Sequence, residues 1–206
     1  MALPLTEQLL LQLVAIIYEP VSAAFLARCL QNLAPKFLGE QRLTADEVSN
    51  LVARLRRAGF LNGKNQCPVV LAEELTRLAI HQKRFAPIAA LVERAAPVNY
   101  LQGKWSTRCW RAIRQFRLGV YRQDFDKVDE ALLFWEKEGR HQLEIEPPAV
   151  LVAGRAFDAK WFVALPGSFQ FFLLDEVIRY SLERLRPFPR IITFLADEGM
   201  QTVSPD

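Results

Sequence analysis

Cysteine and histidine are scarce in this chain, and their positions argue against a metal site or a disulfide framework. Three cysteines, Cys29, Cys67 and Cys109, lie far apart and form no Cys-x-x-Cys pair, and there are two histidines. A structural zinc site needs four such ligands at characteristic spacing. Disulfide frameworks are typical of secreted domains with an even number of cysteines. We therefore expect reduced thiols, no metal ion and no cofactor, in a cytoplasmic protein.

Motifs that identify enzymes are also missing. The sequence contains no glycine-rich phosphate loop, no His-Glu-x-x-His and no Gly-x-Ser-x-Gly. His81 and His141 each stand alone among polar neighbours, which favours a surface position over a catalytic one. We predict no catalytic residue in this chain. A small enzyme whose catalytic groups come from scattered positions is left open as a third interpretation.

Long hydrophobic runs and a strong net charge are absent as well. The apolar stretch Leu9–Ile17 is interrupted by Gln12, and Phe169–Leu174 is shorter still, whereas a membrane-spanning helix needs ~20 apolar residues. The net charge is +3, too small to indicate nucleic-acid binding without local clusters of basic residues. With 51% hydrophobic and 24% charged residues, the composition predicts a folded globular protein.

The N-terminal part of the chain contains three helical patterns. Apolar residues recur at helical spacing in residues 7–18 and 22–33. The third helix starts with a capping box, in which Thr44 is the N-cap and Glu47 follows three residues later. Its expected inward side chains form one stripe: Val48, Leu51, Val52 and Leu55.

Turn and strand signals follow the third helix. Gly59 is placed to end the helix, and Asn62-Gly63 is a two-residue turn signal because both residue types tolerate positive φ. The apolar run Val69–Leu71 then indicates a strand, before a closing helix. Three helices and a two-stranded hairpin are the arrangement of a winged helix-turn-helix domain, which we assign to residues 1–82.

Helical patterns continue through residues 83–206, broken by proline and glycine. The expected helices are 86–94, 106–122, 124–138, 148–153, 158–164 and 168–185. The pair 106–122 and 124–138 has a very short connection, which predicts antiparallel neighbours. No fixed repeat length is present, so the sequence predicts a mainly α fold, with a winged helix-turn-helix domain followed by an irregular α-helical-repeat segment.

One part of this second segment resembles a known repeat. The stretch Gly119–Trp135 resembles the turn and second helix of a tetratricopeptide repeat. The resemblance implies that four side chains pack between helices: Tyr121, Phe125, Ala131 and Trp135.

Candidate nucleic-acid contacts lie on the third helix and in the turn after it. Asn50 and Arg54 are placed to hydrogen-bond base edges. Arg57 and Lys64 are placed to contact phosphates. The acidic pair Asp46-Glu47 occupies the helix end that would enter the major groove, where it would repel phosphate. A structural or partner-binding role for this helix therefore stays open.

A second basic feature is the segment Lys104–Arg122. Its apolar residues fall on one helical stripe, and five arginines occupy the opposite half: Arg108, Arg111, Arg114, Arg117 and Arg122. Guanidinium groups suit phosphate and carboxylate, so this face would track a nucleic-acid backbone or dock an acidic partner. The alternative is a solvated face that pairs with the acidic residues of 124–138.

The C-terminal part carries a family resemblance. Phe157-Asp158-x-x-Trp161, Leu165-Pro166 and a long amphipathic helix follow the winged-helix and helical patterns in that order. This arrangement resembles the N-terminal accessory region of bacterial Swi/Snf-type helicase-like ATPases, and it is similar to regulators of the maltose-activator type.

The resemblance implies a non-catalytic module that binds nucleic acid and positions a larger machine. The ATPase motor would lie outside this chain. The implied partners are duplex DNA, bound with weak sequence preference, and a protein partner or an adjoining ATPase domain. The competing hypothesis is a protein–protein interaction scaffold in which the winged helix is purely structural.

Overall fold

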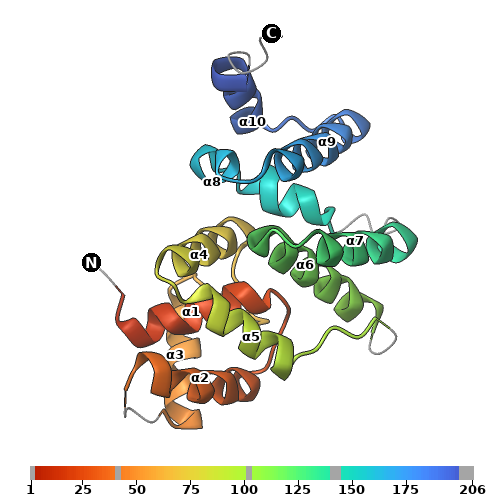
Figure 1. Ribbon diagram of the computed structural model, residues 1–206. Coiled ribbons are helices and arrows are strands. Elements are labelled where there is room, and N and C mark those ends of the chain that lie inside the picture. The colour runs from red at the N-terminus through yellow and green to blue at the C-terminus, as the bar shows by residue number, and fades with distance from the viewer. Residues whose placement is uncertain (1–2, 40–42, 101–103, 140–144, 200–206) are drawn as a thin grey trace.

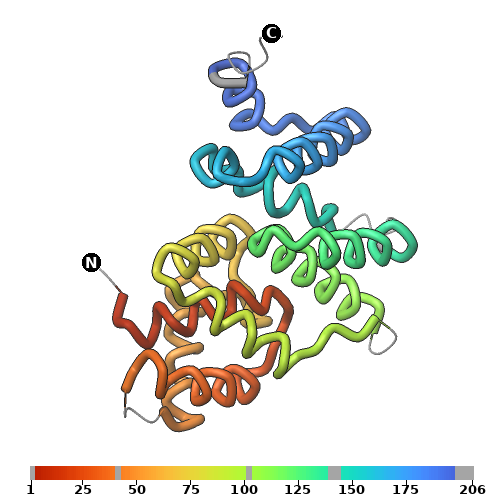
Figure 2. The backbone as a smooth tube through the Cα atoms, viewed as in Figure 1, coloured from red at the N-terminus to blue at the C-terminus, as the bar shows by residue number. Residues whose placement is uncertain are grey.

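The computed structural model describes residues 3–39, 43–100, 104–139 and 145–199. Within these ranges every regular element is a helix, so the predicted mainly α fold is confirmed. Helices α1–α5 gather at one end of the molecule, the α6–α7 pair lies in the middle, and α8–α10 are stacked beyond it (Figure 1). The first described residues lie at the side of the α1–α5 group, and the last described residues lie beyond α9 (Figure 2).

Helix α1, Leu5–Ile17, is the centre of the N-terminal group. It is apolar around its whole circumference, and nearly all of its side chains from Leu9 onward are buried. A helix with apolar residues on every side is stable only when neighbours cover every side. The surrounding helices are α2 (Ala23–Phe37), α3 (Ala45–Arg57), α4 (Val69–His81) and α5 (Phe85–Ala95).

The predicted two-stranded hairpin does not form in the described residues. The run Val69–Leu71, expected as a strand, is the first turn of α4, preceded by Pro68. The Asn62-Gly63 segment forms a compact turn, in which the backbone N–H of Asn62 donates to the carbonyl of Gln66 at 2.9 Å. The three N-terminal helices are present, but the winged-helix assignment is not confirmed because the wing is missing.

Helix α5 shares a hydrophobic core with the helices that precede it. Phe85, Ile88 and Val92 are buried in the same cluster as the apolar side chains of α1 and α2. This packing groups α5 with the N-terminal helices, although the boundary predicted from the sequence, at residue 82, separates them.

Helices α6 (Trp105–Arg122) and α7 (Phe125–Phe134) form the antiparallel pair that the short connection predicts (Figure 1). They are in close contact at Gly119, where an added Cβ would lie 2.8 Å from Cγ2 of Val128. Of the side chains expected to pack in the repeat-like stretch, Ala131 and Trp135 are buried. Helix α7 then continues into the π-helical turn η1 (Trp135–Gly139).

The C-terminal helices pack around a second, aromatic-rich core. The rings of Phe157, Phe162 and Phe194 lie with centroids 5.3–5.6 Å apart. The elements that surround this core are η2 (Val150–Arg155), α8 (Ala159–Val163), α9 (Gly167–Arg184), α10 (Pro189–Phe194) and η3 (Leu195–Gly199). They match the helices predicted at 148–153, 158–164 and 168–185, with η2 as a π-helical turn.

Candidate nucleic-acid interface

Helix α3 is oriented as its sequence pattern predicts. Val48, Val52 and Leu55 are buried in the N-terminal core, while Leu51 is only partly buried. The opposite face is open to solvent and carries the three predicted contact residues of this helix: Asn50, Arg54 and Arg57. The amphipathic pattern thus identified the exposed face correctly.

The first turn of α3 is acidic. The capping box forms as predicted, because the backbone N–H of Thr44 donates to Oε2 of Glu47 at 2.7 Å and the backbone N–H of Glu47 donates to Oγ1 of Thr44 at 3.2 Å. The hydrogen bonds that the backbone N–H and the hydroxyl of Thr44 donate to the Glu47 carboxylate lower the pKa of this carboxyl below its usual value. Together with the exposed Asp46, Glu47 therefore makes this end of the helix negative at neutral pH, where it stabilises the helix dipole.

The last turn of α3 is basic, but Arg54 is partly engaged. Its guanidinium forms an ion pair with the carboxylate of Glu7, on α1. The side chain of Arg54 remains 57% exposed, whereas that of Glu7 is 7% exposed. This contact joins α3 to α1, and it leaves Arg54 less free to contact a base than the sequence suggested.

A side-chain contact fixes the turn after α3 against the basic end of that helix. The guanidinium of Arg56 donates to Oδ1 of Asn65 at 2.5 Å. The amide nitrogen of the same Asn65 side chain donates to the carbonyl of Val21 at 2.8 Å. Asn65 is buried and has positive φ, which asparagine tolerates better than most residues.

This contact determines where two exposed cations lie. Arg57 follows Arg56 in the chain and Lys64 precedes Asn65, so the Arg56–Asn65 hydrogen bond places Arg57 and Lys64 at the same end of α3. Neither of these two side chains pairs with a carboxylate among the described residues. We call the surface formed by Arg54, Arg56, Arg57 and Lys64 the basic end of α3.

The arginines of α6 lie elsewhere than predicted. Arg114 and Arg117 are 1% and 2% exposed, so the expectation that they belong to a surface face is wrong. Neither guanidinium is placed to reach a phosphate backbone. At Arg114 and Arg117, the half of α6 opposite the apolar stripe is covered by α1, α4 and the segments that follow α1 and α5, and these two side chains form hydrogen bonds inside the protein.

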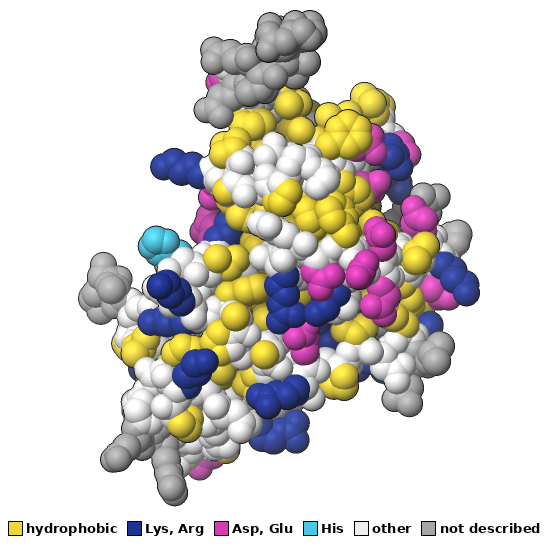
Figure 3. Space-filling model, in the orientation of Figure 1, with side chains coloured by type: hydrophobic (Ala, Val, Ile, Leu, Met, Phe, Trp, Pro, Cys, Tyr) yellow, Lys and Arg dark blue, Asp and Glu magenta, His cyan; other side chains and the backbone are white. Residues whose placement is uncertain are grey.

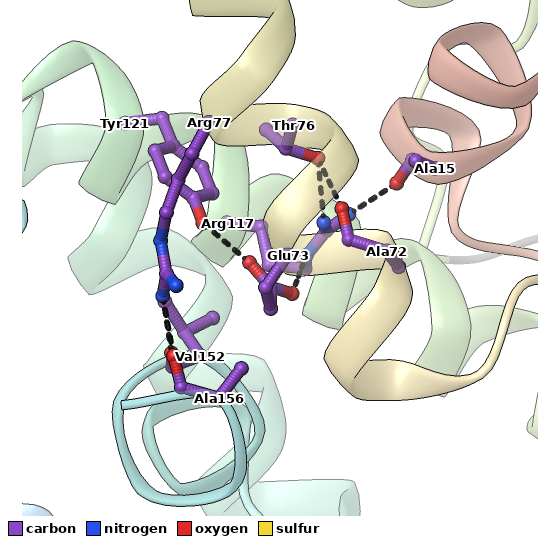
Figure 4. Close-up of polar contacts among 9 residues, drawn as sticks. All are labelled: Ala15, Ala72, Glu73, Thr76, Arg77, Arg117, Tyr121, Val152 and Ala156. Atoms are coloured by element: carbon purple, nitrogen blue, oxygen red, sulfur yellow. Dashed lines mark hydrogen bonds and ion pairs between the residues drawn. The ribbon is translucent and has the colours of Figure 1, made fainter. Parts of the chain in front are cut away.

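Arg117 is the centre of a buried polar network (Figure 4). Its Nε lies 2.6 Å from Oε1 of Glu73, and its other nitrogens donate to the carbonyl of Ala15 at 2.8 Å and to Oγ1 of Thr76 at 3.0 Å. Oε2 of Glu73 accepts from the hydroxyl of Tyr121 at 2.6 Å. Burial by itself lowers the pKa of Arg117, but the charge and hydrogen bond of Glu73, together with the neighbouring Tyr18 and Tyr121, outweigh it, and the net pKa is raised. The guanidinium of Arg117 is therefore charged.

Arg114 forms a second buried contact. Its guanidinium pairs with the carboxylate of Glu19 and donates to the carbonyl of Ala96. Burial, together with the charge of Arg111, lowers the pKa of Arg114, while Glu19 raises it, and the net pKa is below its usual value. The contacts of Arg114 connect α6 with the end of α1 and with the segment after α5. Arg114 and Arg117 thus fix the position of α6 on the N-terminal helices.

Arg108 and Arg111 are partly exposed, at 24% of each side chain. Arg108 lies 3.9 Å from Glu138, which matches the predicted pairing with the acidic segment 124–138. Arg111 lies 3.7 Å from Glu19 instead. The predicted arginine face therefore separates into buried ion pairs and partly exposed arginines near carboxylates.

Arg77, on α4, connects the N-terminal helices with the C-terminal ones. Its guanidinium donates to the carbonyl of Ala156 at 2.7 Å (Figure 4). The same group lies 4.5 Å from the ring centroid of Trp161. Asp158 lies 3.9 Å away. The motif Phe157-Asp158-x-x-Trp161, singled out in the sequence, thus contacts α4 through its Asp and Trp side chains.

The acidic partners of these arginines were not among the site residues predicted from the sequence. Glu7, Glu19 and Glu73 are all buried. Glu73 stands in a helical stripe whose other members, Ala72, Thr76 and Ala79, also face inward. A single carboxylate within an apolar or small-residue stripe indicates a buried ion pair, because an unpaired buried charge is too costly.

No cofactor or metal site emerges from the described residues. A surface cavity of about 480 Å³ lies between α7 and α9 and is lined by residues of both charges, among them Glu176 and Arg184. No group of three or more potential metal ligands occurs in the part of the chain that is described. His81 is exposed, and His141 lies outside the described residues.

Comparisons with known proteins do not identify a family for this chain. No family model, curated protein or solved structure matches the chain. Among the described helices, none has the length and apolar character required to span a membrane.

Proposed function

We propose that this chain is a non-catalytic module that contacts the phosphate backbone of duplex nucleic acid through the basic end of α3. The observation that carries the proposal is the placement of Arg57 and Lys64, which are exposed at one end of the helix and free of carboxylate partners among the described residues. Phosphate contacts of this kind supply affinity without sequence information.

The charge distribution along α3 favours backbone contact over base reading. The end that would enter the major groove carries Asp46 and Glu47. Arg54 is engaged with Glu7, so Asn50 is the remaining candidate for base contact. One exposed asparagine discriminates among few base pairs. The module therefore binds with little sequence preference.

The buried arginine network suits a positioning role. Arg114, Arg117 and Arg77 connect the N-terminal helices with α6 and with the C-terminal stack. The basic end of α3 therefore has a defined position relative to α8–α10. In this proposal, α1–α3 serve as the helix-turn-helix part without the wing, and the chain positions a larger helicase-like ATPase, as the sequence resemblance suggests.

The test compares the affinities of two variants for labelled duplex DNA by fluorescence anisotropy at low salt. We expect the Arg57→Ala/Lys64→Ala variant to bind roughly five- to tenfold more weakly than the natural chain, for every duplex sequence alike. The matched control, Lys160→Ala/Arg190→Ala, removes two exposed cations at the other end of the molecule. It should bind as the natural chain does.

The competing function is the protein–protein interaction scaffold. A folded chain without measurable affinity for DNA or RNA at low salt would favour the scaffold and contradict the proposal. If Asn50→Ala abolished the binding of one DNA sequence and left the binding of other sequences unchanged, the result would show instead that α3 reads bases.

A further inference from the structure

Asn65 is a buried polar residue in an otherwise exposed turn. The turn joins α3 to α4, and the three residues that precede Asn65 are exposed, whereas Asn65 itself is 7% exposed. Both ends of its side-chain amide form hydrogen bonds. Oδ1 accepts from the guanidinium of Arg56 at 2.5 Å, and Nδ2 donates to the carbonyl of Val21 at 2.8 Å. One side chain therefore joins the turn to the end of α3 and to the segment before α2.

The other side-chain hydrogen bonds of the turn close it on itself. Oδ1 of Asn62 accepts from the backbone N–H groups of Lys64 at 2.8 Å and of Gln66 at 3.0 Å. The backbone N–H of Asn65 donates to the carbonyl of Asn62 at 3.1 Å. These bonds give the turn a defined shape without attaching it to a helix. The side chain of Asn65 supplies an attachment.

Asparagine suits this position for two physical reasons. The backbone of Asn65 has φ of 58°, in the left-handed region, which glycine and asparagine adopt more readily than most residues. The amide is also neutral, so Arg56 keeps its net charge while it is held. An aspartate would tolerate the same backbone, but its carboxylate would neutralise Arg56 and repel the carbonyl of Val21. The residue type therefore fixes the turn without removing a cation from the basic end of α3.

Three cations of the basic end of α3 have no carboxylate partner among the described residues: Arg56, Arg57 and Lys64. On the face shown in Figure 3, acidic side chains gather over α7 rather than over α2 and α3. Those carboxylates therefore lie away from the basic end. Because Lys64 directly precedes Asn65 in the chain, the contacts of Asn65 limit where the backbone of Lys64 can lie relative to α3.

We propose that Asn65 is the positioning residue of the phosphate-contacting surface. It anchors the turn, so that Lys64 is presented together with Arg56 and Arg57. A surface that is ordered before binding loses less conformational entropy on association. The role of Asn65 in binding rests on the proposed function, whereas the anchoring of the turn does not depend on nucleic acid.

A double-variant cycle measures whether Asn65 acts through Lys64. Asn65→Gly removes both side-chain contacts and keeps a residue that adopts positive φ. It should weaken duplex binding roughly two- to threefold, as Lys64→Ala does. In the Asn65→Gly background, Lys64→Ala should have little further effect. Arg57→Ala should keep its full effect there, because Arg57 belongs to α3. Independent, additive effects of Asn65→Gly and Lys64→Ala would overturn the proposal.

Asn65→Asp tests the importance of the neutral amide. The added carboxylate should neutralise Arg56, so the slope of log affinity against log salt should become shallower by about 0.9. Asn62→Asp is the matched control, because it adds the same charge to an exposed residue of the same turn that does not contact Arg56. It should change the slope less. Equal changes in both variants would contradict a specific role for the amide of Asn65.

Backbone amide relaxation, measured by NMR without nucleic acid, separates this proposal from the proposed function. In the natural chain, residues 62–66 should be as ordered as the helices, with order parameters of about 0.85, and Asn65→Gly should lower them toward ~0.6. A turn that stays equally ordered in Asn65→Gly would overturn the anchoring, even if the natural chain binds DNA. Loss of order in this variant, in a chain that binds no duplex, would contradict the proposed function and support the anchoring.

Discussion

Arg117 of α6 and Glu73 of α4 form an ion pair at 2.6 Å between Nε and Oε1, with both side chains almost completely buried. The remaining hydrogen-bonding groups of both residues are directed at Ala15, Thr76 and Tyr121. Buried charges are tolerated only when such partners replace the lost water. This pair therefore ties three helices together, and it explains why α6 is rich in arginine without presenting an arginine surface.

The first prediction concerns this pair. Glu73→Leu should lower the free energy of unfolding by ~3–5 kcal/mol, because it leaves the charge of Arg117 buried and unpaired. The Glu73→Leu/Arg117→Leu double variant should recover much of that loss. Urea denaturation of the natural chain, Glu73→Leu, Arg117→Leu and the double variant gives the coupling energy. A loss below about 1 kcal/mol for Glu73→Leu would mean that water reaches the network.

The second prediction concerns the crossing of α6 and α7. Gly119→Ala should destabilise the protein by ~1–3 kcal/mol, the range for an overpacked core. The new Cβ would lie 2.8 Å from Cγ2 of Val128 and 3.0 Å from the carbonyl oxygen of Asp124. Gly167→Ala, where nothing lies within 4 Å, is the matched control on another helix. Equal stability of both variants would show that the two helices separate easily.

The third prediction concerns pH. Glu93 accepts hydrogen bonds from Arg122 at 2.7 and 3.0 Å and from Lys127 at 2.8 Å. Partial burial raises the pKa of Glu93, but these hydrogen bonds and charges lower it more, so the net pKa is below its usual value. The stabilisation is present above the unfolded pKa of ~4.3 and is lost as the pH falls through the lower folded pKa.

Glu93→Gln should therefore be less stable than the natural chain at pH 7, and the difference should shrink on acidification. Thermal unfolding of both proteins from neutral pH to about pH 2 measures it. Glu74→Gln, which changes an exposed carboxylate, should show no such trend. A difference that is independent of pH would contradict the ion pair at Glu93.

The helices were largely predictable because their signals are local. The capping box of Thr44 and Glu47, the apolar stripe of α3 and the short connection between α6 and α7 each depend on neighbouring residues. The hairpin was not predictable with the same signals. A run of three apolar residues such as Val69–Leu71 suits a strand or a first helical turn equally, and Asn-Gly turns also connect helices.

The arginine network could not be read from one helix alone. Periodicity separates the apolar half of α6 from its basic half, but it does not tell whether another helix covers the basic half. That depends on long-range partners such as Glu73 and Glu19, which are far away in the sequence. Asn65 is a similar case, since its burial and its contact with Val21 follow from tertiary packing.

The salt dependence of duplex binding tests the central claim most directly. If the basic end of α3 contacts phosphates, the logarithm of affinity should fall with the logarithm of salt concentration with a slope of about −2 to −3. In Arg57→Ala/Lys64→Ala, the slope should become shallower by nearly two units, about 0.9 for each lost contact. An unchanged slope in that variant, or no binding of the natural chain at low salt, would contradict the account.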